Sequence, residues 1–317
     1  MKANDVLSSV IDKFQRAART NKLVFLLVGR TGVGKSSTVN SLMGKPIALV
    51  GDYEATTMEV EYYESNFNGI EFMVVDTPGL CDDIESEGND EKYLARMRSK
   101  VPQVDSMWFV SRLDDTRVTA DEKRGIKLIS EAFTPEIWKH AVIVFTYANS
   151  VGEARYQEAL SKRTELIKKE IAKYATTKLA NDIPSLAVDN TSKATPDGEE
   201  WLGELYTKVF VRISARGIIP FLMATAERIT PQRFENNTDK QTSDSAKAPN
   251  WKFHEEPARI STTAVQKEII KSRIIDAGII PSLVAAGAGI GAVFGPAGAA
   301  IGGAIGAVVG LIGWLWD

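Results

Sequence analysis

The stretch GRTGVGKS at residues 29–36 constrains this chain most, because it matches the pattern G-x-x-x-x-G-K-[ST]. It follows LVFLLV at 23–28, an apolar run typical of a strand buried on both faces, and a helix is expected from Lys35. Backbone amides of such a loop, with the helix N-terminus, face phosphate oxygens, and Lys35 reaches the β- and γ-phosphates. The expected nucleotide-binding residues are Arg30, Thr31, Gly32, Val33, Gly34, Lys35, Ser36 and Ser37.

A second motif predicts a magnesium site beside that loop. VVDTPG at 74–79 ends an apolar strand with Asp76, about forty residues after the phosphate loop. An aspartate there can hold Mg²⁺ through a water, while the Ser36 hydroxyl ligates the ion and the Gly79 amide meets the γ-phosphate. Thr57 directly precedes a strand and is expected to complete the Mg²⁺ shell, with Thr56 as the competing choice.

The order of apolar runs and helical segments predicts an α/β fold. Five further strands are expected at 58–64, 70–75, 107–113, 141–145 and 185–190, the first two forming an antiparallel pair. Capping boxes predict helix starts at Thr119 with Glu122 and at Ser150 with Glu153, and the pair Thr195-Pro196 predicts another. Such alternation gives a mostly parallel sheet flanked by helices, as in P-loop NTPase domains.

Composition limits the remaining function classes. The chain has 317 residues, 44% hydrophobic and 25% charged, which suits one large core or two unequal parts. A net charge of −3 gives no basic face for nucleic acid, and the lone Cys81 suits a reducing compartment. We expect an amphipathic helix at 1–20, a nucleotide-binding domain at 21–229, a flexible linker at 230–260, and a helix with a hydrophobic tail at 261–317.

Several motifs together resemble the septin-like branch of GTPases over residues 20–215. The similarity is closest to the chloroplast import receptor (Toc) GTPases and the immunity-associated (AIG1-type) GTPases. It is carried by GRTGVGKSSTVNSLMG, DTPGL, RLDDTRVTADEKRGIKLI, FTYANS and VDN. The resemblance implies a G domain that binds GTP and GDP with Mg²⁺.

The resemblance also implies how the base is recognised. The segment HAVIVFTYANS at 140–150 lacks the aspartate of the Asn-Lys-x-Asp motif. In the Toc pattern the carboxylate comes from the other loop, which implies that Asp189, followed by Asn190, accepts from guanine. Tyr147 would pack beside the ring, and Asn149 would offer its amide. The alternatives are that Asp189 is a turn residue at a strand end and Tyr147 a packing aromatic.

Two further residues bear on turnover. Leu80 lies where Ras-like proteins orient the attacking water with a glutamine, so intrinsic hydrolysis is expected to be slow. Arg117 corresponds, by the resemblance, to an arginine that reaches the nucleotide of a facing subunit, which implies a nucleotide-dependent homodimer. The alternative is an arginine that is only solvated or at an interface.

The C-terminal segment from Ala277 to Trp316 contains 40 consecutive residues without Asp, Glu, Lys or Arg. This length is about twice the ~20 residues of one membrane crossing, and glycines recur every four residues within two sets. Two glycine-packed helices at 279–294 and 297–316, folded as a membrane hairpin, are expected. The GTPase domain would then face the cytoplasm. The alternative is a helical pair packed on the enzyme or in an oligomer.

The sequence thus predicts a membrane-associated, slow GTPase that dimerises and acts as a nucleotide-dependent switch. Two other interpretations remain open at this stage. One is a non-catalytic GTP-dependent scaffold with a membrane-active or oligomerising tail. The other is an ATP-directed P-loop protein, because the guanine motif is incomplete.

Overall fold

The structure is a computed structural model of the chain. It describes residues 3–20, 22–48, 61–77, 94–95, 97–99, 101, 103–231, 258–280 and 303–316. Statements below concern these residues.

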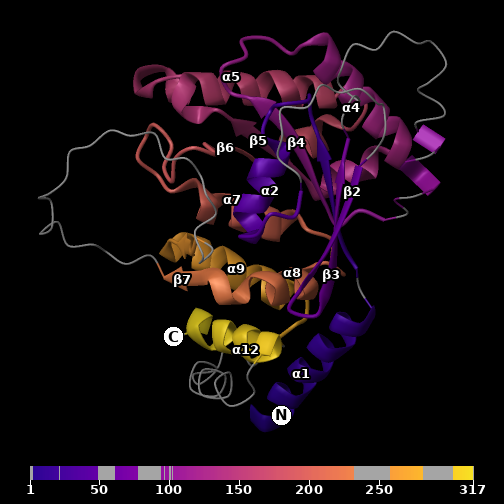
Figure 1. Cartoon of the computed structure of the whole chain (residues 1–317), viewed down its shortest axis with the longest axis vertical. Helices are drawn as coiled ribbons and strands as arrows, with labels where there is room; N and C mark the ends of the chain where they lie inside the picture. Colours follow the sequence, from indigo (N-terminus) through magenta and orange to yellow (C-terminus); the bar gives the residue numbers. More distant parts are fainter. Residues whose placement is uncertain are drawn as a thin grey trace, which may run out of the picture.

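A six-stranded sheet forms the centre of the molecule (Figure 1). The strand order is β2-β3-β1-β4-β5-β6, with β2 antiparallel to β3 and every other pair parallel. The strands are β1 Leu23–Val28, β2 Glu61–Phe67, β3 Ile70–Asp76, β4 Ser106–Arg112, β5 Ala141–Thr146 and β6 Ser185–Ala187. The expected α/β fold with a mostly parallel sheet is confirmed.

Helices cover both faces of this sheet, which explains why the strands in its middle are continuously apolar. They are α1 Ala3–Thr20, α2 Lys35–Met43, α4 Ala120–Phe133, α5 Glu153–Ile171, α6 Thr177–Asn181, α7 Trp201–Arg212, α8 Ile218–Thr225, α9 Ala264–Asp276 and α12 Gly303–Trp316, with 3-10 turns η1 Pro135–His140, η2 Ala148–Ser150 and η3 Ala226–Arg228. Every residue of β1 is buried because alternate side chains enter the two cores.

The two cores have different helical cover. Phe25 of β1 lies in the core shared with α1, α2, α7, α8, α9 and α12, where it packs edge-on against Phe72 at 5.0 Å between ring centroids. Its neighbour Leu26 faces the other core, which α4, α5 and α6 cover. The parallel strands therefore end at one exposed edge, where the phosphate loop follows β1.

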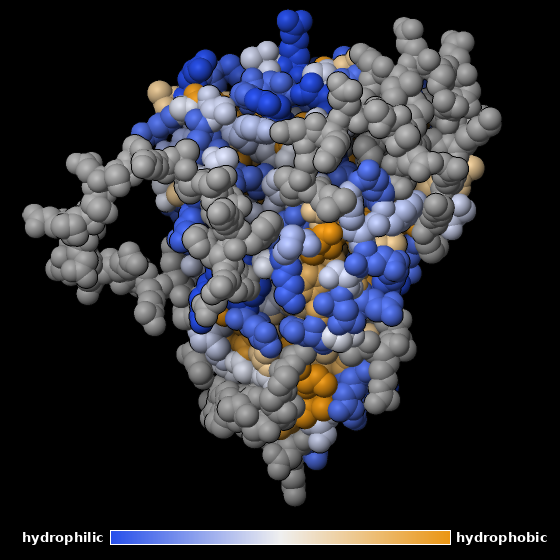
Figure 2. Space-filling model, in the orientation of Figure 1, coloured by the Kyte–Doolittle hydropathy of each residue, from blue (hydrophilic) through white to orange (hydrophobic). Residues whose placement is uncertain are grey.

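The C-terminal helix α12 packs on the first core. Val308, Val309, Ile312 and Leu315 are fully buried, and α12 contacts α1, α8, α9 and η3. Figure 1 shows the yellow α12 beside the indigo α1, and Figure 2 shows an apolar patch in that lower region. Trp314 at its end lies under the Lys267 ammonium, 4.7 Å from the ring centroid.

This packing bears on the expected membrane hairpin. Among the described residues, none of the helices combines the length and apolarity of a bilayer crossing. The 14 residues of α12 extend about 21 Å, against a hydrocarbon core of about 30 Å. The first expected tail helix, 279–294, lies outside the described residues except for Ile279 and Ile280, which are buried in the first core. The described part of the tail therefore matches the alternative in which a tail helix packs on the enzyme.

The structure describes both ends of the expected linker. A short parallel pair joins β7 Ile229–Pro231 to β8 Ile260–Thr262, so the two ends of 230–260 meet. Residues 232–257 lie outside the described residues. Arg228, directly before β7, donates to the carbonyls of Ser41 at 3.0 Å and Ala258 at 2.6 Å, and also to that of Leu42. Burial lowers the pKa of Arg228 to about 10.

Two expected helix starts are wrong. Thr119 and Glu122 do form a reciprocal capping box before α4. Ser150 does not cap α5, because its amide closes the η2 turn on the Tyr147 carbonyl at 3.1 Å, and Gly152 with φ 76° precedes the helix instead.

The pair Thr195-Pro196 does not open α7 either. Gly198 donates its amide to the Thr195 carbonyl at 2.9 Å, and the Thr195 hydroxyl bonds the Asp197 carboxylate at 2.6 Å. Pro196 therefore lies in a turn, and α7 begins five residues later at Trp201.

Candidate nucleotide site

The phosphate loop adopts a conformation that only glycine accepts easily. Gly32 and Gly34 have φ of 74° and 91°, in the left-handed region, and α2 begins at the next residue after Gly34. A Cβ on Gly34 would also lie 2.9 Å from the Asn190 amide nitrogen, so a side chain there would displace Asn190. The loop thus turns the first amides of α2 toward one concave surface, as phosphate binding requires.

Lys35 and Ser36 lie next to Asp76, as the motifs predict. The Lys35 ammonium donates to the carbonyls of Gly29 at 2.9 Å and Arg30 at 3.0 Å, and it lies 3.4 Å from Asp76 Oδ1. The Ser36 hydroxyl donates to Asp76 Oδ2 at 3.3 Å. One cation and two oxygen ligands therefore converge from two loops that lie forty residues apart.

The Asp76 carboxylate is suited to a bound cation. Burial raises its pKa, and the adjacent Lys35 ammonium opposes that shift. Within the described part of the chain, Asp76 Oδ1 is buried and accepts no hydrogen bond that meets ordinary geometry. The Lys35 ammonium, 3.4 Å away, is the cation beside this oxygen, and hard oxygen ligands of this kind are what Mg²⁺ prefers. The residues present therefore fit a magnesium ion.

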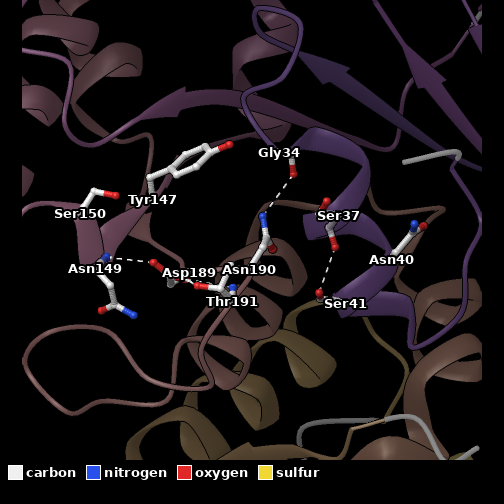
Figure 3. A pocket seen from close by; sticks show the side chains of 10 residues that line it. All are labelled: Gly34, Ser37, Asn40, Ser41, Tyr147, Asn149, Ser150, Asp189, Asn190 and Thr191. Carbon is white, nitrogen blue, oxygen red and sulfur yellow. Dashed lines mark hydrogen bonds between the residues drawn. The ribbon is translucent and has the colours of Figure 1, made fainter. Parts of the chain in front are cut away.

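A cavity of about 730 Å³ opens beside the phosphate loop, within the range of small-ligand sites (Figure 3). It lies between the start of α2 and the loops that follow β5 and β6. Its lining residues are Gly34, Ser37, Asn40, Ser41, Tyr147, Asn149, Ser150, Asp189, Asn190 and Thr191. Both base-recognition loops inferred from the resemblance thus meet at one cavity.

Asp189 has a preorganised carboxylate. Oδ1 accepts from the Thr191 amide at 2.9 Å and from the Thr191 hydroxyl at 2.5 Å, and Oδ2 accepts from the Asn149 amide at 2.9 Å. The residue is only 5% exposed. Since a carboxylate oxygen has two acceptor sites, Oδ2 retains one for a further donor. Figure 3 shows this group between the two loops.

Asn190 and Asn149 have their side-chain amides engaged within the protein. The Asn190 amide donates to the Thr38 hydroxyl at 3.0 Å and to the Gly34 carbonyl at 3.4 Å. It therefore ties the last strand to the phosphate loop. The Asn149 amide group donates to the Ala194 carbonyl at 3.4 Å, while its backbone amide holds Asp189. In this arrangement both asparagines support the cavity wall.

Tyr147 lies across the mouth of the cavity. Its φ of 57° is left-handed, which is uncommon for an aromatic residue, and its hydroxyl donates to the Gly32 carbonyl at 3.3 Å. The Arg112 guanidinium stacks on the ring, 4.0 Å from the centroid. Asp114 pairs with Arg112 at 2.7 Å, and that hydrogen bond holds the pKa of Asp114 below its ordinary value. Tyr147 is 37% exposed and is one of the residues that line the cavity.

Three other residues predicted to bind the nucleotide lie outside the cavity lining: Arg30, Thr31 and Val33. Arg30 pairs with Asp115 at 2.5 Å, which joins the phosphate loop to the loop after β4. Val33 is buried, and its carbonyl accepts from the Thr146 hydroxyl at 2.7 Å. Thr31 is exposed in the loop. Two of the predicted metal and phosphate contacts, Thr57 and Gly79, lie outside the described residues.

Arg117 is exposed in the loop between β4 and α4 and does not line the cavity. Its carbonyl accepts from the guanidinium of Arg163 on α5 at 2.7 Å.

A family comparison now adds to this geometry. A model described as the AIG1 family matches residues 23–195, which is more than half of the chain. The chain belongs to the AIG1 family. This membership confirms the resemblance seen in the motifs, and its matched range contains every described residue of the phosphate, metal and base sites.

Individual relatives of this AIG1 protein are chloroplast translocases. The translocase of chloroplast 34 of Arabidopsis thaliana is 28% identical over 204 residues, covering 60% of this chain and 65% of that protein. The chain therefore matches slightly under two thirds of the length of that relative. Toc33 of the same plant, solved with GDP and Mg²⁺, superposes with a TM-score of 0.51 at 26% identity, covering 71% of this chain and 93% of that one.

A third similar structure concerns dimerization. It is described as showing that dimerization is important for the GTPase activity of the chloroplast translocon components atToc33 and psToc159. It shares 25% identity with a TM-score of 0.50, covering 65% of this chain and 88% of that one.

Sequence reasoning missed several residues that shape the site. Thr191 was identifiable, since a hydroxyl residue two positions after an aspartate commonly bonds that carboxylate. Asn40 on α2 accepts from the amides of Ile47 and Ala48, which no local pattern indicated. Arg112 is the last residue of the buried strand β4, and its stacking on Tyr147 depends on the juxtaposition of β4 and β5.

Proposed function

We propose that this protein binds GTP and GDP with Mg²⁺ and hydrolyses GTP slowly as a nucleotide-dependent, dimerising switch. The observation that carries the proposal is the convergence of Lys35, Ser36 and Asp76 beside a cavity whose far wall presents the Asp189 carboxylate. A phosphate-binding end and a base-binding end thus lie at one site. The binding of GDP and Mg²⁺ by the similar Toc33 supports this assignment.

Mg²⁺ would be held by Ser36, Thr57 and Asp76, the last through a water. When bound, the ion neutralises charge that develops on the phosphate oxygens. Lys35 binds the β- and γ-phosphates, which requires its ammonium to leave the carbonyls of Gly29 and Arg30. The Gly79 amide meets the γ-phosphate.

Asp189 is proposed as the guanine reader. Guanine presents N–H donors at N1 and N2, and the remaining acceptor site of Asp189 Oδ2 suits one of them. Adenine presents an acceptor at N1, which a carboxylate repels. Tyr147 covers the ring, with Arg112 fixing its orientation. The Asp189 carboxylate therefore favours GTP over ATP.

Arg117 is proposed to contact the nucleotide of a facing copy. Its exposed position and the dimerization of similar translocon components support this role. An arginine supplied in trans stabilises charge in the transition state, which a chain with slow intrinsic turnover needs. Arg117→Ala should therefore reduce turnover at high protein concentration without weakening the nucleotide affinity of the monomer.

Membrane association through the C-terminal segment is a separate proposal. The 40 charge-free residues support it, and the burial of α12 on the domain provides the competing arrangement. Flotation of the full chain with anionic lipid vesicles tests it, with a chain lacking residues 277–317 as the control. Co-flotation that requires the segment supports membrane association; a full chain that stays with the unbound protein rejects it.

The central experiment is a titration of the full chain with GTP, GDP and ATP, with and without Mg²⁺. Tight, Mg²⁺-dependent GTP binding with weak ATP binding is expected, and a preference for ATP would refute guanine recognition. Phosphate release under single-turnover conditions then separates the GTPase from a non-catalytic scaffold. A scaffold would bind GTP tightly and release no phosphate above the uncatalysed background.

A further inference from the structure

A buried ion pair lies behind the loop that carries Arg117. Arg163 on α5 and Glu122 on α4 are 2.8 Å apart, and their side chains are 2% and 1% exposed. The same guanidinium nitrogen, Nη2, also donates to the Ser111 hydroxyl near the end of β4 at 2.5 Å. Two helices, α4 and α5, and the sheet strand β4 therefore meet at one guanidinium.

The remaining end of this guanidinium holds the loop itself. Arg163 Nη1 donates to the Arg117 carbonyl at 2.7 Å. Glu122 continues the network, because its Oε2 accepts from the Thr119 amide at 2.8 Å, two residues after Arg117. The two buried, charged side chains of Arg163 and Glu122 thus hold the backbone on the C-terminal side of the loop through hydrogen bonds.

The same loop is also held from the phosphate site. Asp115 pairs with Arg30 of the phosphate loop at 2.5 Å, and both side chains are 26% exposed. The short segment from Asp115 to Arg117 is therefore attached at one end to the phosphate loop and at the other to α5. Arg117 is the last residue of this segment, and its side chain is exposed.

A buried ion pair is weak evidence of a role in stability, since the desolvation of its charges offsets most of the attraction. An apolar pair of similar volume would fill the same space between α4 and α5. It would not hold a loop carbonyl, and a lysine ammonium lacks the planar fork needed to reach Arg117 while also bonding Ser111 and Glu122. Arginine is distinguished here because one guanidinium bonds Arg117, Ser111 and Glu122 at the same time.

We propose that Arg163 is a positioning residue that fixes the backbone of Arg117, so that the Arg117 side chain is oriented toward the nucleotide of a second copy of this chain. The inference rests on the proposed nucleotide-dependent dimer. Arg163 contacts neither nucleotide, and it acts only through the loop.

The test compares Arg163→Lys, Arg117→Ala and the double variant in the full chain. Lysine retains the positive charge beside Glu122, so the buried carboxylate keeps a partner. Lys162→Met is the matched control, since Lys162 is the exposed neighbour of Arg163 on α5 and pairs with the exposed Glu158 of the same helix. Analytical ultracentrifugation with a non-hydrolysable GTP analogue gives the dimer dissociation constant, and a fluorescent GDP titration gives monomer affinity.

Each single variant is expected to weaken dimerisation about tenfold or more, with monomer GDP affinity unchanged. The double variant should be no weaker than Arg117→Ala alone, because Arg163 acts through that side chain. Hydrogen exchange should be faster at residues 113–119 in Arg163→Lys and unchanged in Lys162→Met. Together these results would establish the positioning role.

Two outcomes overturn the inference in distinguishable ways. If Arg117→Ala dimerises like the unaltered chain, the trans contact itself is wrong, and the inference fails with the proposed function. If Arg117→Ala weakens the dimer but the effect of Arg163→Lys is additive to it, or exchange at 113–119 does not change, the trans contact stands and only the positioning role is refuted.

Discussion

The substitution Asp189→Asn separates the role of Asp189 in base recognition from its role in holding the cavity wall together. It preserves the shape of the side chain while replacing one carboxylate oxygen by an amide NH2 group. The charge is lost. The NH2 group then faces either the Thr191 amide and hydroxyl, at the Oδ1 position, or the Asn149 amide and the base, at the Oδ2 position, where the native oxygens accept. GTP binding should weaken, while ATP, whose N1 is an acceptor, should gain a partner.

The magnitude follows from the hydrogen bonds of the native residue. Losing one bond to a charged acceptor costs about 1.5 to 3 kcal/mol, which corresponds to roughly 10- to 150-fold in affinity. Asp189 also accepts from the Thr191 and Asn149 amides, so the substitution is expected to lower the free energy of unfolding by about 1 to 3 kcal/mol. Part of the loss in GTP affinity will therefore reflect the loosened wall.

The ratio of GTP to ATP affinity isolates the reading of the base, since damage to the wall affects both nucleotides. Isothermal titration of the full chain with each nucleotide at saturating Mg²⁺ gives this ratio. Thr191→Val serves as the matched control, because it removes the hydroxyl bond to Asp189 Oδ1 and leaves the charge in place. The ratio should fall about 10- to 150-fold in Asp189→Asn and stay constant in Thr191→Val.

An equal loss for both nucleotides in Asp189→Asn would refute the reasoning. Asp189 would then be a turn residue that ties the two loops together, as its bonds to Thr191 and Asn149 alone would allow. A ratio that falls as far in Thr191→Val would show that wall geometry, and not the carboxylate charge, discriminates the bases.

Three further predictions concern the phosphate end, the C-terminal helix and a surface pair. Lys35→Ala should abolish Mg²⁺-dependent GTP binding in titration, since it removes the phosphate cation; unchanged affinity would exclude this site. Leu315→Ala should lower unfolding free energy in urea by about 2 to 5 kcal/mol, as for a fully buried leucine; a negligible change would show that α12 is not docked in solution. Because the pKa of Asp114 lies below its ordinary 3.8, its pair with Arg112 stabilises the fold above that pH, and this contribution is lost as pH falls through the folded pKa. Asp114→Asn should therefore cost under about 1 kcal/mol at pH 7, given the exposure of the pair, and this cost should shrink in thermal unfolding as pH falls below 3.8; a pH-independent cost would reject the ionic origin.

The phosphate loop and the antiparallel β2–β3 pair were predictable because their determinants are local. A buried strand, a turn that needs glycine at positive φ, and a helix N-terminus follow one another within about fifteen residues at Leu23–Lys35. The capping box at Thr119 and Glu122 is local as well. The box at Ser150 failed since Gly152, with φ of 76°, redirects the chain before α5 begins.

The base site was predicted only in part. The resemblance indicated Asp189, Tyr147 and Asn149, and the structure places all three at the cavity. It did not indicate that Asn190 bonds Thr38, a residue 152 positions away, because that contact exists only when β6 ends beside α2. The hydrogen-bond partner of a polar side chain depends on which groups lie near it in the folded chain. The amino-acid composition does not contain that information.

The amino-acid sequence by itself determined the fold class, the phosphate loop, the AIG1-type motifs and a 40-residue segment without charge. Only the tertiary structure decided where the end of that segment lies and what Arg163 does. A helix as apolar as α12 can be buried equally well in a bilayer or in a protein core, since both remove its surface from water. The packing of Leu315 on the first core and the 2.7 Å bond from Arg163 to the Arg117 carbonyl arise from elements that are distant in the chain and adjacent in space.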